Sequence, residues 1–123
     1  MITLNSGSDD ISVLLGNSDG TFSAQTSFSS ENNLISSTIN DFNGDGSVDL
    51  ITAHRNSDEV SLLLNEGDGT FLAPINLFVA ETFNSISSSD FNGDGILDLV
   101  GANSTTNFLS VFLGVGDLSL IHI

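Results

Sequence analysis

Two short segments of the chain place oxygen-bearing side chains at alternate positions. DFNGDGSVDL runs from Asp41 to Leu50, and DFNGDGILDL runs from Asp90 to Leu99. Each has Asp, Asn and Asp at positions 1, 3 and 5, Gly at position 6 and Asp at position 9. Such oxygens can converge on one ion as the loop turns at the glycine, and the backbone carbonyl of position 7 adds a ligand. Ligation by about six oxygens, with no nitrogen or sulfur, favours Ca²⁺ over Mg²⁺ or Zn²⁺.

The two segments therefore predict two structural Ca²⁺ sites. The candidate ligands of the first site are Asp41, Asn43, Asp45, the carbonyl of Ser47 and Asp49, and those of the second are Asp90, Asn92, Asp94, the carbonyl of Ile96 and Asp98. A pair of metal-free turns rich in Asp and Asn is the alternative. Three carboxylates within nine residues repel one another unless a cation neutralises them, and this favours the metal sites.

Two other calcium motifs fit the segments less well. An EF-hand shares the first six positions but needs Glu at position 12 and flanking helices. Position 12 here is Thr52 in one segment and Gly101 in the other. The calcium-binding β-roll needs tandem G-G-x-G-x-D repeats, which the sequence does not contain.

The charge balance limits the partners that the chain can have. Sixteen acidic residues stand against a single Lys or Arg, so the formal net charge is −15 over 123 residues. This argues against binding to nucleic acid or to an anionic membrane, since both need basic residues. There is no cysteine, and the longest charge-free stretch, Leu99–Gly116, is interrupted by Gly, Asn, Ser and Thr and makes a poor membrane span.

No catalytic group stands out, and we expect the chain not to be an enzyme. His54 is expected in a hairpin or partly buried, no Ser–His–Asp spacing is evident, and the glycines lie in Asp-rich turns without the Lys that phosphate binding uses. We therefore predict no catalytic residues and no organic cofactor.

The elements that position the two acidic segments follow from an internal repeat. A shift of 49 residues aligns the two segments and also aligns ISVLLGNSDGTF at Ile11, VSLLLNEGDGTF at Val60 and LSVFLGVGD at Leu109. The chain thus holds about two and a half copies of one unit. Residues 1–28 are expected to form a partial unit without its first strand and calcium loop, 29–77 a complete unit, and 78–117 a partial unit without its last strand.

Each unit is predicted to consist of four short β-strands. Apolar residues alternate in the three aligned segments, and Asp-Gly follows them in two copies, which indicates strands joined by hairpins. In the complete unit we expect strands at Leu34–Ile39, Asp49–His54, Val60–Asn65 and Thr70–Leu77. The predicted fold is all-β, with tandem four-stranded antiparallel blades of a partial β-propeller. A parallel solenoid is the alternative.

The last six residues depart from the repeat. Gly-Thr-Phe is expected at positions 118–120, but the chain reads LSLIHI from Leu118 to Ile123. The string CTG TCT CTT ATA CAC ATC encodes this hexapeptide and resembles the mosaic end of a transposase-based sequencing adapter. We interpret residues 118–123 as a non-native tail in which His122 has no function; a divergent last strand is the alternative.

These motifs resemble the FG-GAP/VCBS repeat family, which forms the blades of integrin-α-type β-propellers. The resemblance rests on DFNGDGSVDL, DFNGDGILDL, LLGNSDGTF and LLLNEGDGTF, and it covers almost the whole chain. It implies a propeller of about seven blades with Ca²⁺ in the first inter-strand loop, on the same ten residues named above. Because position 3 is Asn rather than Asp, we expect weak binding, with a Kd on the order of 10⁻⁴–10⁻³ M.

An up-and-down unit places its connections on two opposite faces. The calcium loops and the Gly-Asp-Gly hairpins are expected on one face, and the more variable segments and Arg55 on the other, where the resemblance implies ligand binding. These variable segments are Asn5–Asp10, Ser29–Asn33, His54–Glu59, Val79–Thr82 and Asn103–Phe108.

The expected function is that of a calcium-binding propeller segment in a secreted or cell-surface protein. Its expected partners are an extracellular protein or carbohydrate ligand and the remaining blades of the same parent chain, without nucleic acid and without a membrane span. A propeller attached to a secreted polysaccharide-active enzyme and a scaffold spacer are the alternatives.

Overall fold

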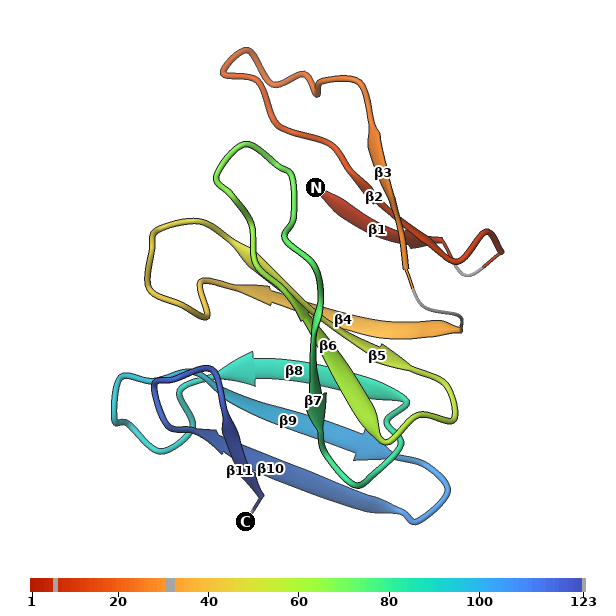
Figure 1. Cartoon of the computed structure of the whole chain (residues 1–123), viewed down its shortest axis with the longest axis vertical. Coiled ribbons are helices and arrows are strands. Elements are labelled where there is room, and N and C mark those ends of the chain that lie inside the picture. Colours follow the sequence, from red (N-terminus) through yellow and green to blue (C-terminus); the bar gives the residue numbers. More distant parts are fainter. Residues whose placement is uncertain (6, 31–32, 123) are drawn as a thin grey trace.

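The chain forms three consecutive antiparallel β-sheets (Figure 1). This computed structural model describes residues 1–5, 7–30 and 33–122. Over these residues every element is a strand, so none is a helix long and apolar enough to cross a membrane. The all-β prediction is confirmed. Each strand pair in the described residues is antiparallel, which excludes a parallel solenoid.

The strands follow one another in chain order within each sheet. The first sheet holds β1 (Ile2–Asn5), β2 (Asp10–Val13) and β3 (Thr26–Ser29). The second holds β4 (Leu34–Asn40), β5 (Asp49–His54), β6 (Glu59–Leu63) and β7 (Ile75–Phe78). The third holds β8 (Ser85–Ser89), β9 (Asp98–Asn103), β10 (Phe108–Gly114) and β11 (Leu120–His122).

The expected strands of the complete unit are found, with one large difference in their bounds. The second strand matches residue for residue, but the fourth begins at Ile75 instead of Thr70. Pro74 directly precedes this strand and has no N–H to donate to a ladder. Before it, the described residues of the hairpin pair as strands only at an isolated bridge between Asn65 and Phe71. The third strand likewise ends at Leu63 rather than Asn65.

The C-terminal residues take part in the third sheet, although we expected its last strand to be missing. Leu120, Ile121 and His122 of β11 pair with β10, and the ring of His122 stacks on Phe112 with centroids 4.8 Å apart. Strand pairing uses backbone groups, so a segment that departs from the repeat can still supply the edge strand. Ile123 of the expected tail lies outside the described residues.

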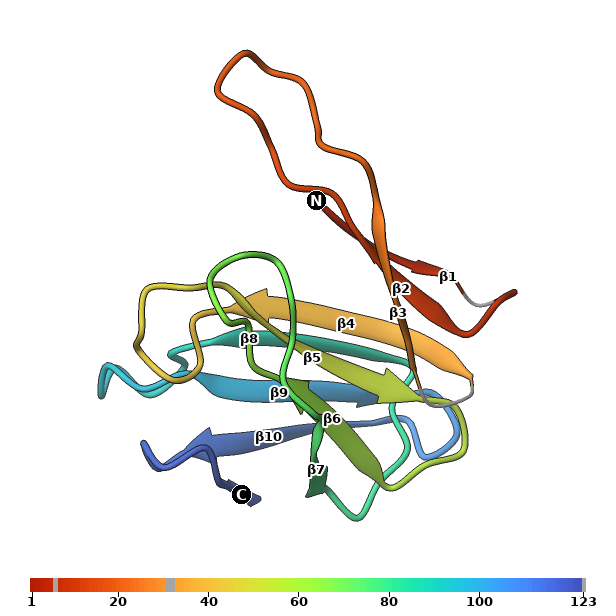
Figure 2. The ribbon, with the colours of Figure 1, turned by 45° about the horizontal axis from the view of Figure 1, so that its top comes forward.

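The sheets pack face to face, with the second sheet between the other two (Figures 1 and 2). Between the first and second sheets, Ile11 and Val13 pack with Leu34, Leu50 and Leu63. The contact between the second and third sheets is larger, and its buried residues are Ile51, Ala53, Val60, Leu62, Val79, Phe83, Ile86, Leu99 and Phe112. The repeated unit is thus one sheet, and the core lies between sheets.

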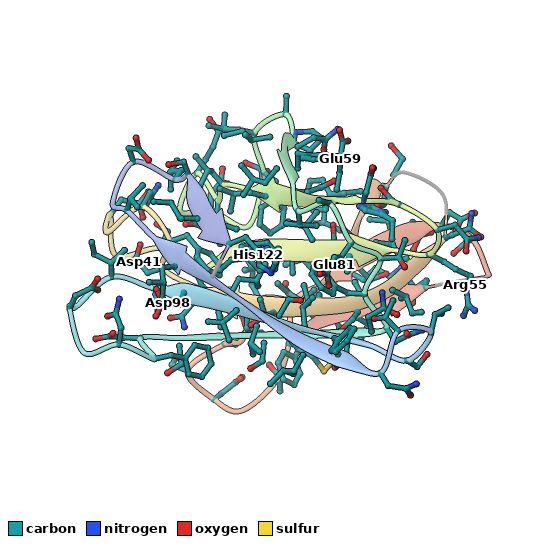
Figure 3. All side chains as sticks on the ribbon, turned by 90° about the horizontal axis from the view of Figure 1, so that it is seen from below. Asp41, Arg55, Glu59, Glu81, Asp98 and His122 are labelled. Carbon is teal, nitrogen blue, oxygen red and sulfur yellow. The ribbon has the colours of Figure 1, made fainter. Side chains whose placement is uncertain are left out.

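The connections between strands gather at opposite ends of the sheets, as their alternating direction requires. Figure 3 shows Asp41 and Asp98 on one side of the molecule and Arg55 on the other. The Asn65 side-chain amide donates to the Val48 carbonyl at 3.1 Å, which joins the hairpin after β6 to the loop before β5. Parts of the opposite segments, at positions 6 and 31–32, lie outside the described residues.

Candidate metal centre

The loop between β4 and β5 curls around the carboxylate of Asp41. Its Oδ1 accepts hydrogen bonds from the backbone N–H groups of Gly44 (2.8 Å) and Asp45 (3.1 Å), and its Oδ2 accepts one from Gly46 (2.9 Å). Both glycines have positive φ, 75° and 88°, which an L-residue rarely adopts. The Gly-x-Gly spacing of the sequence therefore allows the backbone to fold around the Asp41 carboxylate.

The next two candidate ligands are tied to the same turn. Asn43 Oδ1 accepts from the Asp45 N–H at 2.9 Å, and the Asn43 amide donates to Asp45 Oδ2 at 2.7 Å. Asp45 Oδ1 accepts from the Ser47 N–H at 2.7 Å. Positions 1, 3 and 5 are thus held together at an exposed bend, and each of their oxygens that accepts one bond keeps a second lone pair.

The loop between β8 and β9 repeats this network. Asp90 accepts from Gly93, Asp94 and Gly95 at 2.7, 3.2 and 2.9 Å. Asn92 and Asp94 form the same pair of bonds at 2.9 Å each, and Asp94 accepts from the Ile96 N–H at 2.8 Å. Two loops 49 residues apart therefore adopt one hydrogen-bonded shape although positions 7 and 8 differ between them.

Position 9 has different surroundings from the other acids of the loop. Asp49 and Asp98 are fully buried, each with 0% of its surface exposed. Asp49 accepts from the Phe42 N–H at 3.0 Å and from the Asn65 N–H at 2.9 Å. Asp98 accepts from the N–H groups of Phe91 (2.8 Å) and Gly114 (2.9 Å). Each carboxylate thus ties the start of its loop to the end of the third strand of its sheet.

Hydrogen bonding favours the ionised form of one exposed acid in each loop. The Ser47 N–H, followed by the Asn43 side chain, lowers the pKa of Asp45 below its usual value. The Gly95 N–H is the largest of several backbone donors that lower the pKa of Asp90. These carboxylates are therefore negatively charged at neutral pH and offer hard oxygen ligands.

The structure brings only part of each predicted ligand set together. Positions 1, 3 and 5 share one network, whereas position 9 is turned toward backbone donors and position 7 is half-buried. Within residues 1–5, 7–30 and 33–122, no three His, Asp, Glu or Cys side chains gather in a metal-binding arrangement. The donor chemistry fits Ca²⁺, with two carboxylates and one amide per loop at the bend and a third carboxylate beneath it.

The sequence reasoning did not identify Asn65. Its N–H binds Asp49, its amide binds the Val48 carbonyl, and its Oδ1 accepts from the N–H groups of Gly67 (2.9 Å) and Gly69 (3.2 Å). Asn65 therefore links the acidic loop to the Gly-Asp-Gly hairpin. Its counterparts at the 49-residue spacing are Gly16 and Gly114, so the aligned position gave no consistent signal.

The opposite face carries the exposed Arg55, but His54 points away from it. His54 is only 5% exposed, and its Nε2 lies 3.0 Å from Ser61 Oγ and 3.3 Å from Thr52 Oγ1. Its Nδ1 has no hydrogen-bond partner among the described residues. His54 is therefore buried against polar side chains of its own sheet and does not face solvent with Arg55.

The fold and the loops define a protein of tandem β-sheet repeats, each complete repeat with one oxygen-rich loop. The sequence model of the FG-GAP-like repeat matches residues 1–52 and 41–101, and the ends of these matches differ by the repeat length of 49 residues. The chain therefore belongs to the FG-GAP-like repeat family, whose repeats are typical of extracellular and cell-surface proteins. A search of curated proteins and a search of solved structures each gave no match.

Proposed function

We propose that the chain is a calcium-stabilised β-propeller segment of an extracellular or cell-surface protein, with one structural Ca²⁺ in each acidic loop. The observation that carries the proposal is the repeated hydrogen-bond network, which holds ionised Asp side chains at the same bend twice. Nearby carboxylates repel one another, and a divalent cation removes this repulsion. Backbone donors do so only in part.

The proposed ligands divide into two groups. Asp41, Asn43, Asp45 and the Ser47 carbonyl form the exposed group of the first loop, and Asp90, Asn92, Asp94 and the Ile96 carbonyl form that of the second. Asp49 and Asp98 serve first as anchors of the loop, and their remaining lone pairs are available to the ion. The ion supplies positive charge that fixes the bend, and the expected Kd is on the order of 10⁻⁴–10⁻³ M.

The proposed role of the whole segment is ligand recognition without catalysis. The connections opposite the calcium loops differ most between the repeats, and they carry Arg55, the single Lys or Arg of the chain. Variable loops on a rigid β scaffold are where binding residues usually lie. An extracellular protein or carbohydrate is the proposed ligand, and the binding of the chain to immobilised glycans and matrix proteins, with Arg55→Ala for comparison, tests this part.

Calorimetric titration and thermal unfolding of the full chain test the calcium sites. Wild type should bind two Ca²⁺. If Kd is about 1 mM, about 10 mM Ca²⁺ should raise the free energy of unfolding of the chain by about 1.4 kcal/mol per site. The double variant Asp45→Asn/Asp94→Asn should lose both effects. Asp68→Asn is the matched control, because it removes an exposed Asp from a hairpin outside the loops.

Two results would contradict the proposal. One is wild-type protein whose melting temperature stays the same in millimolar Ca²⁺. The other is an equal response to Ca²⁺ in the loop variant and in the Asp68→Asn control, which would show that the cation acts through general charge screening.

A further inference from the structure

An asparagine directly followed by a glycine occurs twice in the chain, and both pairs lie in the acidic loops. They are Asn43-Gly44 in the first loop and Asn92-Gly93 in the second. All four residues are exposed. In such a pair the backbone nitrogen of the glycine can attack the side-chain carbonyl carbon of the asparagine, because the glycine has no side chain to hinder the approach. The two pairs are therefore chemically prone to lose the asparagine amide.

The reaction has two steps and needs only water as a co-reactant. In the first step a bond forms between the Gly44 nitrogen and Asn43 Cγ, the bond from Cγ to the amide nitrogen breaks, and ammonia leaves with the proton of the Gly44 N–H. In the second step water opens the resulting cyclic imide. Cleavage at Cγ gives aspartate, and cleavage at the backbone carbonyl gives isoaspartate, whose main chain is longer by a methylene group.

The hydrogen bonds of the first loop restrain both reacting groups. The Gly44 N–H donates to Asp41 Oδ1 at 2.8 Å, and a carboxylate beside this N–H opposes the loss of its proton, which the attack requires. Asn43 Oδ1 accepts from the Asp45 N–H at 2.9 Å, and the Asn43 amide donates to Asp45 Oδ2 at 2.7 Å. Attack makes the carbonyl carbon tetrahedral and expels the amide nitrogen, so it disrupts both bonds to Asp45.

The second loop restrains its pair in the same way. The Gly93 N–H donates to Asp90 Oδ1 at 2.7 Å. The two bonds between Asn92 and Asp94 are each 2.9 Å long. One chain therefore holds two copies of the same reactive pair in the same network, and each copy is an internal reference for the other.

We propose that Asn43 and Asn92 are sites of spontaneous deamidation, and that the closed loop slows a reaction which the opened loop permits. Both products replace the amide that donates to Asp45 or Asp94 with a carboxylate, which repels that acid. A loop that has reacted therefore does not restore its original network, and its opening becomes irreversible. The reaction needs no bound ion, so it is independent of the proposed calcium sites.

Peptide mapping by mass spectrometry tests this on the full chain aged at neutral pH in a chelator, either folded or unfolded in urea. Chymotryptic peptides of the two loops are distinguishable, because one contains Ser47-Val48 where the other contains Ile96-Leu97. Both Asn-Gly pairs should react at least about tenfold faster in urea than in the folded chain, where they react only from the opened loop. Asn17 is the chemical control, because it is exposed but followed by Ser, and it should react more slowly than both pairs in urea.

A single substitution separates the network of one loop from the fold of the whole chain. Asp41→Ala removes the acceptor of the Gly44 N–H and leaves the second loop intact. It should speed up deamidation of Asn43 at least about threefold and leave Asn92 at its wild-type rate. Asp68→Ala is the matched control, because it removes an exposed Asp of a hairpin outside the loops, and it should change neither rate.

Several results would overturn the proposal. One is an equal rate for the folded and the urea-unfolded chain, and another is an Asn-Gly pair that reacts no faster than Asn17 in urea. A folded Asp41→Ala variant that speeds up both loops, or neither, would show that the local network does not set the rate. Circular dichroism establishes whether this variant is folded. If it is not, Asp90→Ala provides the mirrored test, and the comparison of folded with unfolded wild type decides without either variant.

Discussion

The second and third sheets carry acidic loops with the same hydrogen bonds, but different side chains pack in their cores. Their loops share eight equivalent hydrogen bonds, and no pair of equivalent distances differs by more than 0.2 Å. Away from the loops, Leu34 and Thr52 of the second repeat correspond to Phe83 and Gly101 of the third. The hydrogen-bond geometry of the loop is thus the same in the two repeats, while the sizes of the packed side chains differ. Hydrogen bonds require fixed distances and angles, whereas a core can be filled by several combinations of side chains.

The largest expected effect concerns the two buried anchors, which should matter equally in both sheets. Asp49→Asn and Asp98→Asn each place an amide NH₂ where a carboxylate oxygen accepts a backbone N–H, and this leaves a buried donor without a partner. Each variant should lower the free energy of unfolding by about 2–4 kcal/mol in the absence of Ca²⁺. Urea denaturation in a chelator measures this loss.

Asp45→Asn, measured under the same conditions, is the control for the anchors. Asp45 is exposed and binds only within its own turn, so its replacement should change stability much less in chelator. If Asp49→Asn destabilised the chain only when Ca²⁺ was present, position 9 would be purely a metal ligand and not an anchor of the fold.

The next prediction tests whether the third sheet needs the small Gly101 beside the large Phe83. A Cβ on Gly101 would lie 2.3 Å from ring atoms Cδ1 and Cε1 of Phe83, which is 2% exposed. Gly101→Ala should therefore cost about 1–3 kcal/mol of stability through overpacking. Gly7→Ala is the control, because no described residue beyond its chain neighbours lies within 4 Å of the added Cβ.

A double variant sharpens this prediction. Phe83→Leu/Gly101→Ala approaches the Leu34 and Thr52 combination of the second sheet, so it should be more stable than the sum of the single changes predicts. The expected coupling is at least about 0.5 kcal/mol in a double-mutant cycle. Strictly additive losses would show that the side-chain volumes at positions 83 and 101 do not compensate for each other.

The sheets could be predicted from the sequence, but the role of the buried Asp residues could not. Apolar alternation and the 49-residue repeat predicted the sheets, because both depend on side-chain types that are visible in the sequence. The clamping role of Asp49 and Asp98 was not predicted. Their partners are backbone N–H groups of Asn65 and Gly114, and every residue except proline has such a group, so no residue type marks the position.

The end of the third sheet was missed for a related reason. The expected Gly-Thr after Asp117 is absent, yet Ser119 donates to Asp117 as Thr21 donates to Asp19 and Thr70 to Asp68. Leu118 takes the left-handed φ of 68° that Gly69 holds at 89° in the second sheet. Ser119 thus replaces the usual Thr, and Leu118 replaces the usual Gly at the cost of a strained φ. β11 then pairs with β10 through its backbone.

The smallest expected effect compares these hairpins by their pKa values. The Thr70 hydroxyl, followed by the Thr70 N–H, lowers the pKa of Asp68, and the Ser119 hydroxyl and N–H do the same for Asp117. Both should titrate by NMR below the value of about 3.9 found in unstructured peptides. Because the folded pKa is the lower one, this contribution to stability is complete above about pH 3.9 and disappears as the pH falls through the folded pKa.

Thr70→Val separates the two donors in the second sheet. It removes the hydroxyl, which is the larger cause, and keeps the backbone N–H. The pKa of Asp68 should therefore rise toward about 3.9 without reaching it. Asp117 serves as the internal control and should keep its low pKa, since its donors belong to the third sheet. An unchanged pKa at Asp68 would mean that the backbone alone sets the charge of this hairpin. The replacement of Thr by Ser in the third sheet would then have no electrostatic consequence.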